Sequence, residues 1–279
     1  MTDPLVGRTV EVDGRRVHFH VRGDGPPVVL LHGLGSLAEE ILPAFTATLP
    51  GRRLFAFDRP GYGFSDPLPE AEAGADGQAD WLAGVLSALG LSRITLVAHS
   101  IGAGPALAFA ARHPGRLAGV LLVAPFCRPT PHAPMPLLRA AIAPVIGPVM
   151  RTAVVPLIAP LIGPGILAAA LKPNEVPDYL ADFPFVHAGR DSAILAMAAE
   201  LLAFNDAMAA VAPILAGGGV PMAVVAGEAD EIAEPAWHLA WLSGVLPDAR
   251  VETLPGVGHA PHHADPPAVA AALARIGVP

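Results

Sequence analysis

Short runs of apolar residues recur along the chain and end in glycine, proline or a polar residue. Runs rich in valine, leucine and isoleucine lie at 27–33, 52–58, 94–100, 117–125, 221–227 and 249–256. Continuous apolar runs of this length are typical of strands that are covered on both faces, as in a parallel sheet. Residues 15–22 instead alternate between apolar and polar side chains, which predicts a half-exposed antiparallel strand.

Helical patterns lie between most of these runs, at 39–49, 78–89, 101–112, 237–245 and 267–276. Repeated alternation of strand and helix is typical of βαβ units. The pattern therefore predicts an α/β fold, with a mostly parallel, doubly wound sheet of about eight strands.

The alternation stops between residues 127 and 215. This stretch contains a ladder of prolines at 144, 148, 156, 160 and 164, followed by a helical run at 190–204. We interpret 127–215 as a helical, proline-rich, apolar cap, inserted into a core domain that comprises 1–126 and 216–279. Because an interior proline removes a helix hydrogen bond and clashes with the preceding turn, we expect short helical pieces that each begin at a proline.

Residues 152–171 carry no charge and meet the length criterion for a membrane span. The proline ladder argues against this interpretation, because a spanning helix tolerates one or two such breaks. Three roles stay open for the apolar stretch at 137–171: it lines a pocket, packs on the core, or docks on a lipid surface.

Composition and charge exclude several classes of protein. The chain has 279 residues, of which 53% are hydrophobic and 15% charged, so it can bury a large core. A net charge of −8 without a lysine or arginine cluster argues against a nucleic-acid partner. The single cysteine, Cys127, leaves no intrachain disulfide, and the N-terminus lacks the pattern of a signal peptide. We therefore expect a cytoplasmic protein.

Polar residues close several of the apolar runs, and ligands bind at that edge of an open parallel sheet. Ser100, Asp230 and His259 follow in this order and offer a nucleophile, an acid and a base. A serine hydroxyl needs a base to take its proton and a sharp strand-to-helix turn to expose it. Gly102 is the small residue that such a turn needs after the serine, whereas Ala98 replaces the usual glycine before it. We expect Ser100 as nucleophile, His259 as base and Asp230 as the acid that orients the base.

Other residues compete for these roles. Glu228 and Glu231 are alternative acids beside Asp230, and His262 and His263 closely follow His259. The Gly-Val-Gly sequence directly before His259 lets the loop approach the sheet, which favours His259 as the base. The spacing His-x-x-His-His-x-Asp resembles a set of metal ligands, but a proline interrupts it and the chain shows no second ligand cluster. We therefore predict neither a metal nor a cofactor, and expect two of the three histidines to be surface or hydrogen-bonded structural groups.

The predicted reaction also needs two backbone N–H groups that bind the developing oxyanion. We expect these from Ile101, which follows the nucleophile, and from Leu34, which follows the apolar run at 27–33. Three further polar residues border tight turns, and we expect structural hydrogen bonds from them: His32, His99 and Asp58. Cys127 has no acid–base group around it and is expected to be a small buried side chain.

Five segments, taken in order, resemble the α/β-hydrolase superfamily along nearly the whole chain: VVLLHGLGS, FAFDRPGYGFSD, LVAHSIGAG, VVAGEADEIAEP and LPGVGHAPHHADP. The resemblance implies a serine-nucleophile, cap-containing, esterase- or lipase-like member. A similar A-H-S-x-G turn occurs in small bacterial lipases, which implies that Ala98 is tolerated. The similar haloalkane dehalogenases and epoxide hydrolases carry aspartate at the position of Ser100, which argues against those two reactions.

We therefore expect a serine hydrolase that cleaves a small carboxylic ester with an apolar acyl or alcohol group through an acyl-enzyme intermediate. The same residues suit a C–C bond hydrolase of ring-cleavage products, although that family tends to have a more polar, glycine-rich loop than HGLGS. A lactonase, a thioesterase and a cofactor-free perhydrolase also stay open. A non-catalytic ligand-binding protein and a membrane-peripheral accessory protein are alternatives from another class.

Overall fold

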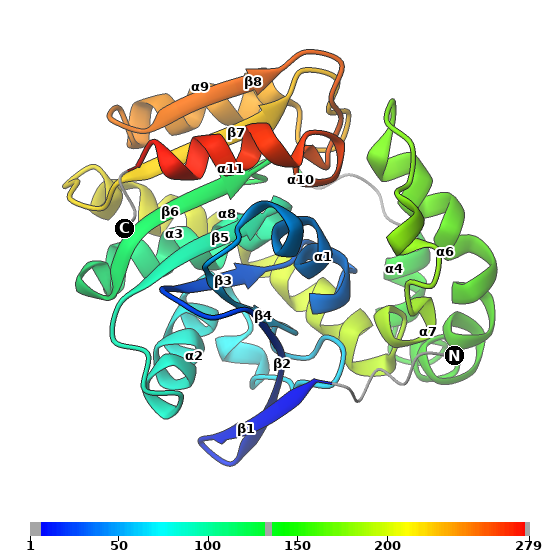
Figure 1. Ribbon diagram of the computed structural model, residues 1–279. Helices are drawn as coiled ribbons and strands as arrows, with labels where there is room; N and C mark the ends of the chain where they lie inside the picture. Colours follow the sequence, from blue (N-terminus) through cyan, green and yellow to red (C-terminus); the bar gives the residue numbers. More distant parts are fainter. Residues whose placement is uncertain (1–6, 132–135, 277–279) are drawn as a thin grey trace.

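The computed structural model describes residues 7–131 and 136–276, in which eight strands form one sheet (Figure 1). The strand order is β1-β2-β4-β3-β5-β6-β7-β8. Strand β2 runs antiparallel to β1 and β4, and the other neighbouring pairs are parallel, which confirms the predicted sheet. The strands are β1 (Arg8–Val12), β2 (Arg15–Arg22), β3 (Pro27–Leu31), β4 (Arg53–Phe57), β5 (Ile94–His99), β6 (Leu117–Val123), β7 (Met222–Gly227) and β8 (Arg250–Leu254).

The sequence pattern predicts seven of these strands and misses β1. The five residues of β1 are exposed or half-buried, so they lack the apolar run that marks a covered strand. Pairing with β2 holds β1 in place, with Arg8 opposite Phe19 and Val12 opposite Arg15.

Helices cover both faces of the sheet, which explains the continuous apolar runs. Along β3, Val28 and Leu30 pack toward α1 (Ala38–Thr48) and α11 (Pro266–Ala274), whereas Val29 and Leu31 pack into the opposite core cluster. Each fully buried valine or leucine stabilises the fold by about 1.5–3 kcal/mol. The opposite face is covered by α2 (Ala75–Ala88), α3 (Ala103–Arg112) and α9 (Pro235–Val245). Short helical turns lie in the connections, at Glu70–Glu72, Ser100–Gly102, Pro114–Arg116, Asp178–Leu180 and α10 (Pro261–Ala264).

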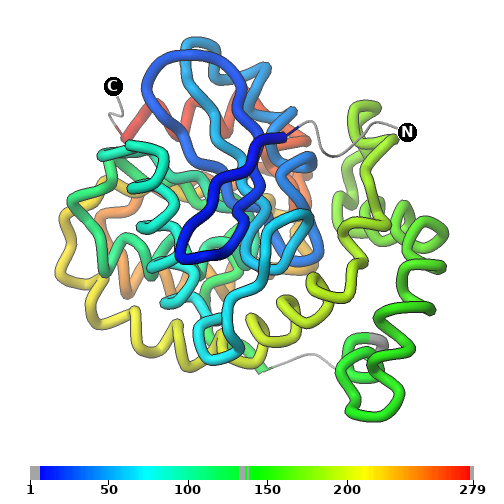
Figure 2. The backbone as a smooth tube through the Cα atoms, turned by 90° about the horizontal axis from the view of Figure 1, so that it is seen from below, coloured from blue at the N-terminus to red at the C-terminus, as the bar shows by residue number. Residues whose placement is uncertain are grey.

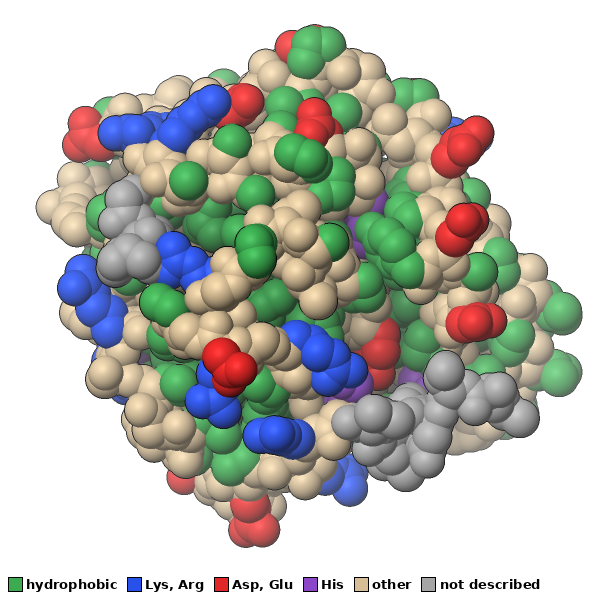
Figure 3. Space-filling model, in the orientation of Figure 1, with side chains coloured by type: hydrophobic (Ala, Val, Ile, Leu, Met, Phe, Trp, Pro, Cys, Tyr) green, Lys and Arg blue, Asp and Glu red, His purple; other side chains and the backbone are tan. Residues whose placement is uncertain are grey.

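Between β6 and β7 the described chain is helical and forms a lobe beside the sheet (Figures 1 and 2). The last helix of this segment, α8 (Asp191–Leu215), returns to the core and packs against α2 and α3. A hollow separates the lobe from the core, and histidine side chains are visible in it (Figure 3). The segment contains α4 (Pro136–Ile142), α5 (Gly147–Val149), a π-helical turn (Met150–Val154), α6 (Val155–Leu171), α7 (Phe185–Ala188) and α8 (Asp191–Leu215).

The prediction that prolines divide this segment into short helical pieces is wrong for α6. Pro148 and Pro156 stand in the first turns of α5 and α6, but Pro160 and Pro164 lie inside the 17-residue helix α6. The spacing of four explains this, because it puts the prolines of α6 on one stripe, where Pro160 and Pro164 are exposed. The carbonyl groups that lose a partner lie along the same stripe, where water can bond them.

Two helical stretches of the described chain are long and apolar enough to cross a membrane, judged by length and composition alone. In Gly147–Leu171 an 18-residue window has a mean hydropathy of 2.2, and 17% of this window is buried. In Asp191–Leu215 the corresponding window has a mean hydropathy of 1.6 and is 33% buried. Leu157 and Leu161 of α6 are 73% and 77% exposed. The lobe thus has an apolar outer surface, and lipid docking by residues 137–171 stays a prediction.

Candidate active site

Ser100 stands on a sharp turn between β5 and α3. Its φ of +56° is a left-handed backbone conformation that non-glycine residues rarely adopt and that is concentrated at functional sites. A Cβ on Gly102 would lie 2.8 Å from the carbonyl oxygen of His32, so this position requires glycine. Ala98 is fully buried, with Leu31 and Leu122 as its register partners on the neighbouring strands. The sheet therefore accommodates the methyl group that replaces the usual glycine.

The structure brings Ser100, His259 and Asp230 together from the ends of three parallel strands. The Ser100 Oγ and His259 Nε2 are 2.8 Å apart, and His259 Nδ1 lies 2.8 Å from Asp230 Oδ2. An ionised carboxylate only accepts hydrogen bonds, so Nδ1 carries the proton and Nε2 is free to accept from the serine. The other oxygen of Asp230 accepts from the backbone N–H groups of Ile232 and Ala233, at 2.8 and 2.9 Å, which fixes the carboxylate.

The rival acids lie outside this arrangement. Glu228 is exposed and its carboxylate accepts from the hydroxyl of Thr253, and Glu231 is also exposed. Asp230 is 4% exposed and is the one of the three that contacts His259. The geometry therefore agrees with the choice of Asp230.

The loop that contains Leu34 lies against the Ser100 turn. A Cβ on Gly33 would be 3.1 Å from the Ser100 Cβ, so the two backbones approach closely. Ile101 is 2% exposed and directly follows the serine. The predicted oxyanion donors thus belong to two segments that meet at Ser100, and their role stays a prediction.

A buried arginine that the sequence reasoning missed holds this loop. Arg59 is fully buried, and its guanidinium donates to the carbonyl oxygens of His32 and Gly33, at 2.9 and 3.1 Å. The same guanidinium forms an ion pair with Glu200 on α8. The negative charge of Glu200 raises the pKa of Arg59 despite the opposing effect of burial. The FDRPG motif contained this residue, but nothing in its spacing marks the arginine as buried.

His32 and Asp58 have the structural roles that the sequence predicts. His32 Nδ1 donates to the carbonyl oxygen of Gly33 at 2.8 Å, and burial lowers the pKa of His32 to about 3, so the ring is neutral. Asp58 accepts from the backbone N–H of Phe64 in its own Pro-Gly loop, and also from that of Ala38 at the start of α1. Both side chains fix backbone near the site.

His99 does not bond its own turn. Its Nε2 donates to the carbonyl oxygen of His259 at 2.9 Å, so it holds the loop that carries His259. Burial is the main cause that lowers the pKa of His99 well below the usual value, and the ring is neutral. Nδ1 of His99 and Nδ1 of His262 are buried without a hydrogen-bond partner among the described residues.

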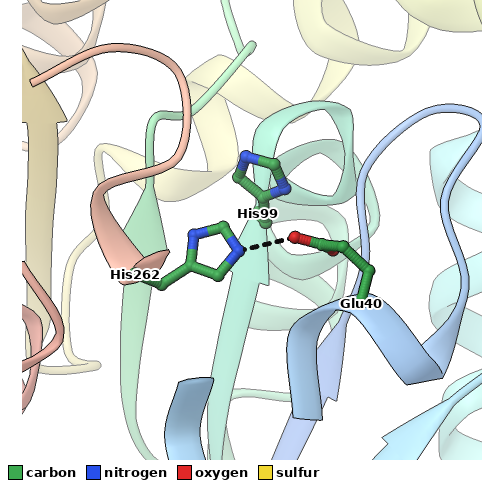
Figure 4. A group of neighbouring side chains, drawn as sticks. All are labelled: Glu40, His99 and His262. Atoms are coloured by element: carbon green, nitrogen blue, oxygen red, sulfur yellow. Dashed lines mark hydrogen bonds and ion pairs between the residues drawn. The ribbon is translucent and has the colours of Figure 1, made fainter. Parts of the chain in front are cut away.

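The sequence shows no second ligand cluster, but the fold brings one carboxylate and one further histidine to the histidines that follow residue 259. Glu40 of α1 lies beside them, and its Oε1 is 2.8 Å from His262 Nε2 and 2.6 Å from His263 Nε2 (Figure 4). His99 completes a buried group with Glu40 and His262, in which the potential ligand atoms lie within 4.8 Å of one another. His262 and His263 are hydrogen-bonded, as predicted, but neither is on the surface.

Apolar side chains surround the Ser100 turn. The N–H of Phe126 donates to the Ser100 carbonyl oxygen at 3.1 Å, and the Phe126 ring packs 5.0 Å from that of Phe204 on α8. A Cβ on Gly35 would lie 3.4 Å from the sulfur of Met197, so α8 reaches over the HGLGS loop. Apolar substrate groups fit such surroundings.

Cys127 lies close to this apolar wall and is fully buried, as the sequence predicts. Its backbone N–H donates to Nδ1 of His238, and burial raises the pKa of the thiol. The thiol is therefore protonated and unsuited to act as a nucleophile.

A family model described as the alpha/beta hydrolase fold matches residues 26–163. The 2-hydroxymuconate semialdehyde hydrolase of Pseudomonas sp. (strain CF600) is 35% identical over 130 residues, which are 43% of this chain and 44% of that protein. This match therefore spans less than half of the curated relative.

Solved structures match nearly the whole chain. A thermophilic esterase from Thermogutta terrifontis has a TM-score of 0.69 at 23% identity, over 96% of this chain and 97% of that one. The enol-lactonase from Burkholderia xenovorans LB400 has a TM-score of 0.72 at 22% identity, over 98% and 100%. These structures share the fold of the chain. The family match over residues 26–163, on the eight-stranded sheet, identifies the chain as a member of the α/β-hydrolase superfamily.

Proposed function

We propose that the protein is a hydrolase in which Ser100 attacks a carbonyl carbon of the substrate. The observation that carries the proposal is the continuous hydrogen-bond chain from Asp230 through His259 to Ser100, with 2.8 Å at each link. His259 takes the serine proton as the bond forms, and Asp230 stabilises the resulting imidazolium. The N–H groups of Leu34 and Ile101 are the proposed donors to the oxyanion.

For the bond that breaks, we propose a C–C bond next to a carbonyl group in a ring-cleavage product. The supporting observation is the similarity to 2-hydroxymuconate semialdehyde hydrolase, which favours this alternative over a carboxylic ester. After Ser100 adds to the carbonyl carbon, the C–C bond breaks and its electron pair moves into the conjugated part of the substrate. His259 returns the proton to the departing carbon skeleton, and water then hydrolyses the acyl-serine.

Ester hydrolysis is the second candidate function. The apolar surroundings of Ser100, with Phe126, Phe204 and Met197 nearby, favour an uncharged acyl or alcohol group. The HGLGS loop also lacks the polar character expected of a ring-cleavage hydrolase. The two reactions share the acyl-serine and differ in whether the leaving atom is carbon or oxygen.

Two assays on the same preparation test these functions. One follows the loss of ultraviolet absorbance of 2-hydroxymuconate semialdehyde, and the other follows nitrophenol release from esters of increasing chain length. Ser100→Ala should abolish both activities and labelling by a fluorophosphonate. Ser243→Ala is the matched control, because this helix serine bonds only the carbonyl oxygen of Ala240 among its described contacts and should keep full activity.

The outcomes separate the candidates. Faster turnover of the semialdehyde than of every ester supports the C–C reaction, whereas ester turnover alone replaces it with the second candidate. A wild-type protein that turns over neither substrate and resists the fluorophosphonate would overturn the assignment as a serine hydrolase.

A further inference from the structure

A buried group of three side chains lies behind the predicted nucleophile, outside the Ser100–His259–Asp230 chain. Glu40 comes from the first turn of α1, His99 from the end of β5, and His262 from α10. All three are at most 8% exposed, and their potential ligand atoms lie within 4.8 Å of one another (Figure 4). We propose that Glu40, His99 and His262 bind a divalent transition metal ion, with Zn²⁺ as the best match.

The free nitrogen of His99 is the first argument. Because Nε2 donates to the carbonyl oxygen of His259, Nδ1 carries a lone pair instead of a proton. This lone pair is buried and has no donor among the described residues. A buried acceptor without a partner costs free energy, and a metal ion between His99 and the Glu40 carboxylate removes that cost.

The outer contacts of the group are the second argument. Histidines that bind metals almost always donate the other ring N–H to an oxygen, which fixes the ring and its tautomer. His99 has this contact with the His259 carbonyl, and Glu40 Oε2 accepts from the hydroxyl of Ser36 at 3.0 Å. His263 Nε2 also lies 2.6 Å from Glu40 Oε1, and its Nδ1 lies 2.8 Å from the Tyr179 hydroxyl.

The donor set selects the ion. Imidazole nitrogens with one carboxylate suit Zn²⁺, which prefers four ligands and borderline-soft donors, over Ca²⁺ or Mg²⁺, which prefer oxygen. Metal binding at Nε2 of His262 displaces the proton that now bonds Glu40, and because a neutral imidazole carries one proton, that proton moves to Nδ1 of the same ring. The bound ion would join α1, the residue before Ser100 and the helix that follows His259, and so stabilise the Ser100 turn against the His259 loop.

The experiment uses the untagged full chain, because a polyhistidine tag binds the same metals. After dialysis against Zn²⁺ and then metal-free buffer, plasma mass spectrometry should find about one Zn²⁺ per chain. Zn²⁺ should also raise the melting temperature by several degrees, since a ligand that binds the folded state stabilises it. Co²⁺ in place of Zn²⁺ should give visible absorption bands of a four-coordinate ion.

Glu40→Gln keeps the size of the side chain and should abolish Zn²⁺ retention, the thermal shift and the Co²⁺ bands. Its matched control is Glu39→Gln on the same helix turn, where the carboxylate contacts His20 at 3.2 Å and Zn²⁺ retention should persist. A wild-type chain that retains no Zn²⁺ and shows no thermal shift overturns the proposal, whatever the variants do. Equal retention by Glu40→Gln and wild type, with circular dichroism unchanged, overturns it as well.

Discussion

The buried ion pair between Arg59 and Glu200 makes a sharp prediction about stability. Glu200 is 3% exposed, and its carboxylate faces the Arg59 guanidinium while also accepting from Gln78 Nε2 at 3.2 Å and Tyr62 Oη at 2.9 Å. Glu200→Gln keeps the size of the side chain but removes the negative charge. The cation of Arg59 then stays buried without the carboxylate that compensates it.

Removing one partner of a buried ion pair costs about 3–5 kcal/mol, because the other charge stays out of water and uncompensated. For a protein of this size, each kcal/mol lowers the melting temperature by roughly 2–4 °C. Glu200→Gln should therefore lower the melting temperature by about 10 °C.

Thermal and urea unfolding, followed by circular dichroism, measure this loss. The matched control is Asp80→Asn, which breaks an ion pair with Arg112. The two charged groups are 2.7 Å apart, and the side chains of Asp80 and Arg112 are 51% and 43% exposed. An exposed pair is worth less than about 1 kcal/mol, so this variant should unfold almost as the wild type does. Equal losses for Glu200→Gln and Asp80→Asn would refute the reasoning from burial.

Three further predictions follow from the site. Asp230→Asn should lower turnover by about 10⁴-fold with unchanged circular dichroism, because His259 loses the acceptor that sets its tautomer, whereas the exposed Glu231→Gln should keep full turnover. Gly102→Ala should lower turnover by about tenfold to a hundredfold, because the added Cβ would lie 2.8 Å from the carbonyl oxygen of His32. Gly115→Ala is the control and should keep full turnover, because a Cβ there would meet no atom within 4 Å. Cys127 is 0% exposed, so a thiol reagent should label it only after denaturation; rapid labelling of the folded chain would contradict this.

The sequence was sufficient for the features that depend on local pattern and on the rules of parallel sheets. Six strands were predicted from continuous apolar runs and β2 from alternation, whereas β1 was missed because its side chains are exposed or half-buried. Ser100, Asp230 and His259 were found together because the carboxyl ends of parallel strands meet at one edge. Periodicity and strand order carry this information without any knowledge of side-chain contacts.

Arg59 and Glu40 were beyond this reasoning for a physical reason. A charged side chain in a loop or a first helical turn is normally exposed, and its burial is stable only when a specific partner compensates the charge. For Arg59 that partner, Glu200, is 141 residues away, and the two histidines that bond Glu40 are 222 and 223 residues away. No spacing rule connects positions so distant, so only the folded chain shows these pairs.

The proline ladder was misinterpreted because the prediction counted the breaks and did not consider where the freed carbonyl groups point. One interior proline removes a hydrogen bond wherever it stands, but the effect of several depends on where the freed carbonyl groups point. A spacing of four keeps the prolines of α6 on one side, and Pro160 and Pro164 are exposed there, so water can replace the lost bonds. A spacing that alternated faces would leave some of these carbonyl groups against the rest of the lobe, where no water compensates them. The spacing of the prolines, and not their number alone, therefore bears on whether the helix breaks.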